Sequence, residues 1–238
     1  MSLPTWTPNE LKSEAKPWEG KAWRVAEGQH IISTRKLVGN VYEQNILDEI
    51  VDETKPRVPE SCQHLDYLLF TPFRYQPYPH GSRFRSAGMT DGVFYAAQEY
   101  ETAIAELAHY RMKFYQDSPG LEPPDNATDY TAFQVHLKTP FTLDLTTGPF
   151  VEYEGFWTRD TDYVPCQALA ATSHEAGIEV IISRSVRDKN DRKNVNVLSC
   201  AAFATPKPLI MQTWKIFVSG KSVTAYCQSP KTVLEFAA

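Results

Sequence analysis

The sequence has few cysteines, no excess of positive charge and no long hydrophobic run. Its 238 residues include four cysteines, widely separated and without a Cys-x-x-Cys pair. This pattern predicts reduced, scattered thiols in a cytoplasmic protein and argues against a disulfide framework. The formal net charge is −5 at pH 7 and no long basic run is present, so nucleic acid is not an expected partner.

Several common kinds of site are also missing. No apolar run approaches the roughly 20 residues of a membrane span, and the N-terminus lacks a signal-peptide pattern, so no membrane association is expected. The chain has neither a G-x-x-x-x-G-K-[ST] phosphate loop nor a G-x-G-x-x-G or G-x-S-x-G motif. Its six histidines form no H-x-H or H-E-x-x-H pair, and we therefore expect no metal site.

The hydrophobic pattern predicts an α+β fold, with strands dominating the second half and connections too short for regular βαβ winding. A proline loop separates two alternating stretches, 133–137 and 141–145, which predicts an antiparallel hairpin. Helices are expected at residues 34–51, 99–115 and 165–176. Further strands are expected at residues 66–70, 93–96, 178–183, 195–198, 210–218 and 223–227.

Three arginines flank a Gly/Pro-containing loop between two predicted strands. They are Arg74, Arg83 and Arg85. Guanidinium groups bind phosphate oxygens in a bidentate manner and stay charged at any relevant pH. The alternative is a set of surface ion pairs. Two nearby tyrosines, Tyr75 and Tyr95, fit either a ring-stacking role or ordinary half-buried positions.

Glu106 lies at the edge of the apolar arc of the predicted helix 99–115. A carboxylate there is partly withdrawn from water and needs a hydrogen bond or a cation. Glu106 is therefore either an ordinary glutamate at the boundary of the apolar side or a functional group. Ser185 and Arg187 follow a predicted strand and Asn196 lies in the next one. A hydroxyl at a strand end can orient a ribose or an amide, but serine is also a common turn residue.

Taken together, the order of these motifs resembles the RES-domain family, named for an arginine, a glutamate and a serine. The resemblance covers roughly residues 23–205. In the loop, Arg-Phe-Arg replaces the Gly-Arg-Trp that is commoner in the family, so its second pocket arginine is either Arg83 or Arg85. The matching motifs are Arg74-Tyr75, Gly81 to Arg85, Gly92 to Ala97, Glu101 to Glu106 and Ser185 to Arg187.

The resemblance implies an ADP-ribosyltransferase-like core of mixed and antiparallel sheets flanked by helices. It also implies a bacterial toxin that consumes NAD+ as a substrate, with no cofactor, by breaking the nicotinamide–ribose bond. Arg74, Glu106 and Ser185 would be catalytic. The NAD+-binding residues would be Tyr75, Arg83, Arg85, Tyr95, Arg187 and Asn196.

The implied chemistry suits these residue types. Nicotinamide leaves from a ribose oxocarbenium ion, which a carboxylate such as Glu106 can stabilise. Arginines would clamp the pyrophosphate. The acceptor is phosphate or water, or else a protein side chain, in which case the enzyme is an ADP-ribosyltransferase. A third hypothesis is a module that binds ADP-ribose without turnover.

Family resemblance further implies a cognate antitoxin with a helix-turn-helix of the Xre type. For the domain organisation we expect an irregular N-terminal arm at residues 1–22 and an extension at residues 23–66 whose helix packs on the core. Residues 67–238 would form the RES domain.

Overall fold

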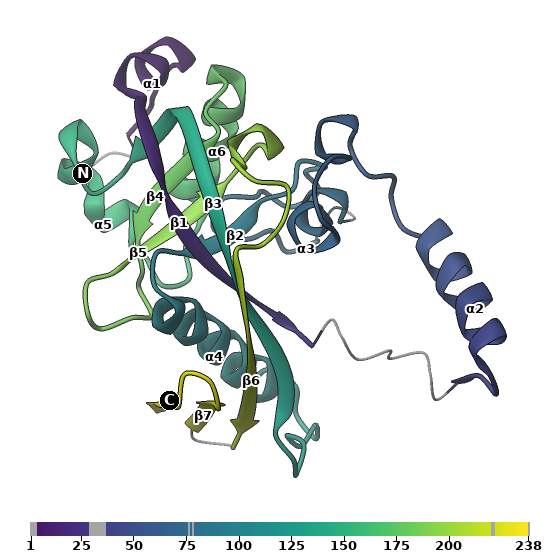
Figure 1. Ribbon diagram of the computed structural model, residues 1–238. Helices are drawn as coiled ribbons and strands as arrows, with labels where there is room; N and C mark the ends of the chain where they lie inside the picture. The colour runs from purple at the N-terminus through teal and green to yellow at the C-terminus, as the bar shows by residue number, and fades with distance from the viewer. Residues whose placement is uncertain (1–3, 29–36, 76, 78, 220–221, 238) are drawn as a thin grey trace.

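The computed structural model describes residues 4–28, 37–75, 77, 79–219 and 222–237. An eight-stranded, mostly antiparallel sheet organises them, in the order β1-β2-β5-β4-β3-β6-β7-β8. Strand β1 (Lys16–Glu27) pairs with β3 (Thr128–Asp144) as well as with β2, so five strands form a closed ring and β6 to β8 extend from β3 (Figure 1). The α+β class expected from the sequence is confirmed.

The other strands follow the predicted order, except that β8 was not expected from the sequence. They are β2 (Phe94–Ala97), β4 (Val180–Arg184), β5 (Lys193–Val197), β6 (Ile210–Val218), β7 (Ser222–Cys227) and β8 (Thr232–Ala237). The α-helices are α1 (Pro8–Glu14), α2 (Val41–Glu53), α3 (Tyr67–Phe70), α4 (Tyr100–Gln116), α5 (Glu154–Trp157) and α6 (Val164–Ala176). Short 3-10 turns include η2 (Glu60–Cys62), η3 (Thr71–Arg74), η4 (Gly148–Tyr153) and η5 (Cys200–Ala202).

Strand β3 replaces the expected hairpin at residues 133–137 and 141–145. Strand β1 pairs along almost the whole of β3, so the two alternating stretches are one strand. Pro140, which lacks an N–H group, lies where the β1 register shifts between Lys16 and Trp18. The proline thus marks a bulge in the pairing and not a chain reversal.

Residues 66–70 were expected to form a strand but form helix α3. The Asp66 carboxylate accepts a hydrogen bond from the Leu68 N–H at 3.0 Å, which caps the helix. Pro72 then lies in the first turn of η3, where a missing N–H costs little. Local capping chemistry therefore outweighs the apolar run Tyr67–Phe70.

Helices cover both faces of the sheet. Helix α4 packs on one face through Ala103, Ile104 and Ala108, which share a buried cluster with Trp214 of β6. On the other face, α3 and η3 contribute Leu69 and Phe73 to a second cluster. Helix α6 packs in a third cluster, and Gly177 ends it with φ at 73°, a left-handed conformation that glycine adopts without strain.

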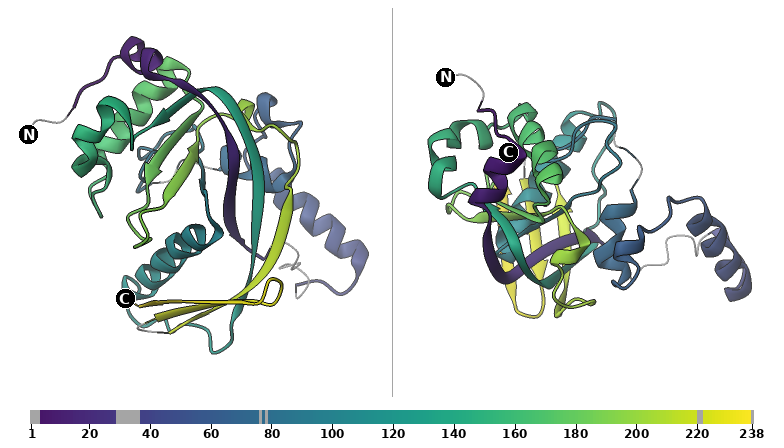
Figure 2. Two further views of the ribbon diagram at one scale, coloured as in Figure 1. Left: turned by 60° about the vertical axis from the view of Figure 1, so that its left-hand side comes forward. Right: turned by 90° about the horizontal axis from the view of Figure 1, so that it is seen from above.

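The N-terminal region differs from the expectation. Of the expected irregular arm at residues 1–22, the described part, residues 4–22, contains α1 and the first part of β1 and so is not irregular. Strand β1 is a central strand of the ring. Helix α2, which was expected to pack on the core, stands away from the sheet with most of its side chains exposed (Figures 1 and 2).

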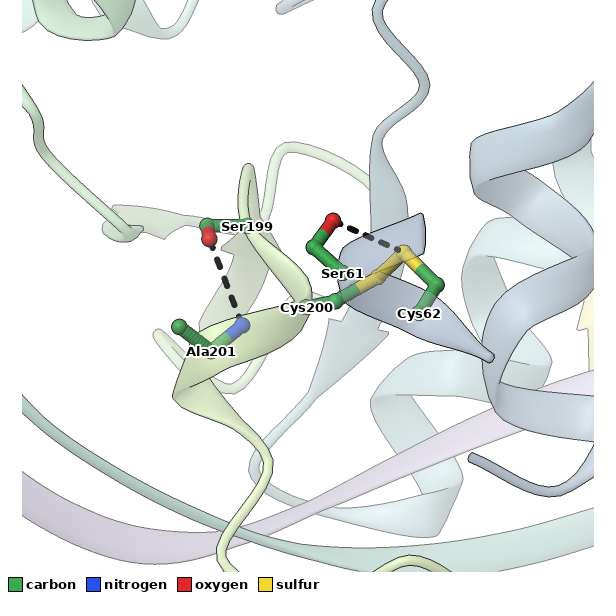
Figure 3. Close-up of a disulfide and its surroundings, with 5 residues drawn as sticks. All are labelled: Ser61, Cys62, Ser199, Cys200 and Ala201. Carbon is green, nitrogen blue, oxygen red and sulfur yellow. Dashed lines mark hydrogen bonds between the residues drawn. A yellow bond between two sulfur atoms is a disulfide. The ribbon is translucent and has the colours of Figure 1, made fainter. Parts of the chain in front are cut away.

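A disulfide joins Cys62 of η2 to Cys200 of η5, with a Cα–Cα distance of 5.4 Å (Figure 3). The prediction of reduced, scattered thiols is therefore wrong for this pair. The two cysteines are 138 residues apart, so their proximity depends on the packing of η2 against the strands and is invisible in the spacing. Cys166 and Cys227 are free and buried.

Candidate active site

A cavity of about 510 Å³ lies beside α4 and strands β1, β2 and β5, within the usual size range of small-molecule sites. Glu106 of α4 stands in its wall. The polar and aromatic residues that line the cavity with it are Arg24, Tyr75, Ser82, Arg83, Arg85, Tyr95, Tyr110, Tyr163, Asn194 and Asn196.

Two hydrogen bonds fix the Glu106 carboxylate. Its Oε1 atom accepts one from the Ser185 hydroxyl at 2.7 Å and another from the Asn194 Nδ2 atom at 2.7 Å. The Ser185 hydroxyl in turn accepts the N–H groups of Arg187 and Asp188, each at 3.2 Å. The turn after β4 thus determines where the serine points, and the serine determines where the carboxylate points.

Helix α4 is held in place from two directions. Its buried side packs in the same cluster as β6 and β7. In its first turn, the Thr102 hydroxyl donates to Asp188 Oδ2 at 2.6 Å, which ties the helix to the turn that carries Ser185. Glu106 and its hydrogen-bond donors are therefore parts of one connected unit.

Three guanidinium groups line the cavity, against the single carboxylate of Glu106. Arg24 donates from Nη1 to the Tyr95 carbonyl at 2.8 Å and lies 4.9 Å from the centre of the Phe94 ring. Burial lowers the pKa of Arg24, but a guanidinium remains charged at any relevant pH.

The two loop arginines are anchored to backbone carbonyls. Arg83 donates from Nη1 to the carbonyls of Trp157 and Arg159 at 3.0 and 2.9 Å. Arg85 donates from Nη2 to the carbonyls of Tyr75 and Met89 at 3.3 and 2.9 Å. Because carbonyl partners do not neutralise the positive charge of Arg83, this side of the cavity is suited to an anion.

Tyr95 joins the arginine loop to strand β2. Its hydroxyl lies 2.7 Å from Ser82 Oγ and accepts the Phe84 N–H at 3.0 Å. Burial raises the pKa of Tyr95 to about 12, so the phenol is neutral at physiological pH. Its place in the wall is set by these bonds.

The structure brings together six of the nine predicted site residues, namely Tyr75, Arg83, Arg85, Tyr95, Glu106 and Asn196, all in the cavity lining. Asn196 is nevertheless committed to the fold. It is buried, and its Nδ2 atom donates to the Ile181 carbonyl at 2.9 Å and to Ser183 Oγ at 3.2 Å.

Arg74, predicted to share a cavity with Glu106, does not line this one. It lies in a second cavity of about 460 Å³. Its donors are occupied by the Pro56 carbonyl at 2.8 Å and by the carboxylate and carbonyl of Asp52 at 3.0 and 3.3 Å. The arginine holds the end of α2, a contact that a local sequence window does not reveal.

Ser185 and Arg187 are also outside the described lining of the Glu106 cavity. Ser185 is 3% exposed, and its hydroxyl donates its proton to Glu106. The serine therefore orients the carboxylate and does not itself contact a ligand. The Arg187 guanidinium binds the carboxylate and carbonyl of Asp160 at 2.9 and 2.7 Å.

Sequence reasoning missed five polar or aromatic side chains in the lining: Arg24, Ser82, Tyr110, Tyr163 and Asn194. A charged residue within the strand-like segment Trp23–Ala26 is the signal that was available for Arg24. Asn194 is notable because its Oδ1 atom is buried at the cavity without a hydrogen-bond partner, while its Nδ2 atom holds Glu106.

Among the residues with described positions, no group of three His, Cys, Asp or Glu side chains is placed to hold a metal ion. Within the same part of the chain, no helix has the length and apolar character needed to cross a membrane.

The family model for the RES domain matches residues 57–219, more than half of the chain. The chain belongs to the RES-domain family. No curated protein matches its sequence.

This RES-domain protein also has a similar solved structure. One chain of the crystal structure of the M. tuberculosis MbcT–MbcA toxin–antitoxin complex aligns with it at a TM-score of 0.50 and 11% identity, over 92% of this chain and 95% of that chain. At this identity the likeness shows the fold. Within the RES-domain protein, Glu106 and Ser185 lie inside the matched residues, whereas Arg24 and strands β7 and β8 lie outside them.

Proposed function

We propose that the protein is a toxin that depletes NAD+ by cleaving its nicotinamide–ribose bond. The observation that carries the proposal is the oriented Glu106 carboxylate in a cavity with three guanidinium groups. An NAD+ molecule needs this pairing, because it carries a pyrophosphate at its centre and develops positive charge on a ribose as the bond breaks.

In the proposed reaction, the C1′–N bond breaks and its electron pair leaves with neutral nicotinamide. The ribose becomes an oxocarbenium ion, which the Glu106 carboxylate stabilises electrostatically. Phosphate or water then forms the new C1′–O bond, and water loses a proton in that step. No metal or cofactor takes part.

Roles for the other side chains follow from their contacts. Arg24 together with Arg83 or Arg85 binds the pyrophosphate. Ser185 positions Glu106 without touching the substrate. The unpartnered Asn194 Oδ1 atom accepts a hydrogen bond from a ribose hydroxyl or from the nicotinamide amide. Arg74 holds α2 and has no part in the reaction.

The cellular setting is part of the same proposal. The related fold occurs in a toxin–antitoxin complex, which supports a cognate antitoxin as a partner, and we expect that antitoxin to carry a helix-turn-helix. We place the protein in the cytoplasm, where NAD+ is available. The Cys62–Cys200 disulfide is the observation that argues against this compartment, because disulfides are rare there.

The test is product analysis by mass after incubation of the purified protein with NAD+, with and without phosphate. Free nicotinamide is expected, together with ADP-ribose in water or its phosphorylated form in phosphate. Glu106→Gln should lower turnover about 1,000-fold, because it removes the negative charge beside the cation. Glu99→Gln, an exposed residue at the start of the same helix, is the matched control.

Three results would contradict the proposal. Ligand-induced stabilisation without any product indicates a binding module. A protein band labelled from NAD+, with little free ADP-ribose, indicates transfer to a protein. Equal turnover by wild type and Glu106→Gln removes the carboxylate from the mechanism.

A further inference from the structure

The two loop arginines stand on a tight turn at residues 82–85, which we call the arginine turn. The Ser82 N–H donates to the Arg85 carbonyl at 2.7 Å, and the Arg85 N–H donates to the Ser82 carbonyl at 3.2 Å. Arg83 and Arg85 both line the cavity of Glu106, so the shape of this turn determines where two guanidinium groups lie. Charged donors that are already in place bind an anion more tightly than mobile ones, because less side-chain freedom is lost.

A side-chain amide of helix α6 joins the two carbonyls of the arginine turn. Gln167 donates from Nε2 to the Ser82 carbonyl at 2.9 Å and to the Arg85 carbonyl at 3.4 Å. A primary amide carries two N–H donors on one nitrogen, which suits two acceptors that lie side by side. In the described part of the chain, Gln167 is outside the lining of the cavity. Its amide therefore acts on the turn and not on a ligand.

Gly81 allows this amide to approach the turn. Its φ is 65°, a left-handed conformation that glycine adopts without strain. A Cβ atom at this position would lie 2.7 Å from the Arg85 carbonyl oxygen and 3.1 Å from the Gln167 Nε2 atom. The first distance is shorter than van der Waals contact, so a larger residue would displace the turn from α6. The glycine and the glutamine are thus two parts of one contact.

Helix α6 also supports the side chains of the arginine turn. Tyr163 immediately precedes the helix, four residues before Gln167, so both lie on the same side of it. The Arg83 guanidinium carbon lies 4.6 Å from the centre of the Tyr163 ring. Phe84 is 1% exposed and packs in the same cluster as Leu169 of α6. The turn is therefore attached to α6 through its backbone and through two of its side chains.

Strand β2 also holds the arginine turn, but through different atoms. The Tyr95 hydroxyl lies 2.7 Å from Ser82 Oγ and accepts the Phe84 N–H at 3.0 Å. Neither bond reaches the two carbonyls that Gln167 joins. Tyr95 therefore does not duplicate the contact made by Gln167.

We propose that Gln167 is a positioning residue for the NAD+ site, because it fixes the arginine turn so that the loop arginines are placed to bind the pyrophosphate. The inference rests on the proposed function, since it takes the pyrophosphate of NAD+ as the anion. The pyrophosphate is bound in the ground state and in the transition state alike, so a loosened turn raises KM and leaves kcat nearly unchanged. Ser185 differs, because it orients the carboxylate that stabilises the transition state.

The first experiment measures the binding of ADP-ribose by isothermal titration calorimetry. ADP-ribose keeps the pyrophosphate but has no nicotinamide–ribose bond, so its Kd reports binding without turnover. Gln167→Met keeps the length of the side chain and removes both donors. It should raise the Kd for ADP-ribose and the KM for NAD+ about tenfold each, and should change kcat less than about twofold. Gln116→Met, the same change at an exposed position at the end of α4, should leave all three values unchanged.

The second experiment reaches the same contact from the turn. Gly81→Ala should raise the Kd for ADP-ribose about tenfold or more, because the added methyl group displaces the Arg85 carbonyl from the amide. The double variant Gly81→Ala with Gln167→Met should lose little more than Gly81→Ala alone, since both changes break the same contact. Two losses that multiply would indicate independent, merely destabilising effects and would overturn the proposal.

Three further results overturn the proposal. They are an unchanged Kd in either folded variant, a fall in kcat at unchanged KM, and no binding of ADP-ribose to the wild type at about 1 mM. If the wild type binds ADP-ribose but releases no nicotinamide from NAD+, the proposed function fails, and the Kd values of the variants still decide the role of Gln167 in anion binding. Circular dichroism checks that each variant is folded, and if Gln167→Met does not fold, the Kd of Gly81→Ala decides.

Discussion

Two arginines in two neighbouring cavities show how different the roles of the same side chain can be. Arg24 and Arg74 are both withdrawn from solvent at cavity walls, and Tyr75 lines both cavities. Arg24 donates a hydrogen bond to the Tyr95 carbonyl and lines the same cavity as Glu106. Arg74 binds the Asp52 carboxylate and two carbonyls.

The difference is one of remaining capacity. A guanidinium has five N–H donors, and an incoming phosphate needs both free donors and unneutralised charge. The salt bridge to Asp52 neutralises the charge of Arg74, whereas no described salt bridge involves Arg24. Proximity to a cavity therefore does not make an arginine a ligand-binding group. The groups that the guanidinium already binds determine whether it can also bind a ligand.

Of the effects expected here, the largest is the difference in kcat/KM between variants of Arg24 and Arg74, and it tests the comparison directly. Arg24→Gln should lower kcat/KM for NAD+ by about 100-fold or more, because it removes a charged donor from the cavity. Arg74→Gln should change kcat/KM by less than about tenfold, while loosening α2, since only the anchor is lost. Steady-state kinetics and limited proteolysis of both variants measure the two effects. Equal kinetic losses in two equally folded variants would refute the assignment.

A smaller effect sharpens the description of the first cavity. Ser185→Ala should lower kcat about tenfold with little change in KM, because Glu106 loses one of its two hydrogen bonds but keeps the other from Asn194. Ser185→Thr keeps the hydroxyl and should recover most of the rate. If KM rises and kcat is unchanged, Ser185 contacts the substrate, contrary to the structure.

The smallest effect concerns stability at high pH. Burial raises the pKa of Tyr95 from 10.0 to about 12, so the folded state keeps a proton that the unfolded state releases. This contribution is fully present below pH 10 and is lost as the pH rises to about 12. It amounts to about 3 kcal/mol at most.

Comparison with Tyr95→Phe isolates this contribution from those of other tyrosines. Denaturant titrations between pH 9 and 12 should show the wild type losing more stability than the variant. Parallel pH profiles for the two proteins would mean that the Tyr95 hydroxyl is hydrated.

Local sequence signals predicted the elements whose structure depends on their own residues. The period of Ala103, Leu107 and Tyr110 gave helix α4, and Pro165 with Gly177 gave both ends of α6. The same signals failed where distant pairing decides. Strand β1 converts an apparent hairpin into the single strand β3. The error at residues 66–70 has a different cause, because the Asp66 cap that makes the apolar run a helix is a local signal that the sequence analysis did not use.

The candidate site divides in the same way. The loop arginines, Tyr95 and Glu106 lie close together in the sequence, and the structure places them in one cavity. The family itself was also recognisable from the order of short motifs, and the family match over residues 57–219 confirms it. The sequence alone therefore determined the loop, the strand and the helix that carry the loop arginines, Tyr95 and Glu106.

Only the tertiary structure decided that Arg24, and not Arg74, lines the cavity of Glu106. The pairing of Trp23 with Ala97 sets β1 beside β2, and it brings Arg24 to the carbonyl of Tyr95, 71 residues away. The same packing turns Arg74 toward α2. Sheet register and burial depend on contacts between distant segments, because a side chain's partners are set by what the folded chain places around it and not by its neighbours in the sequence.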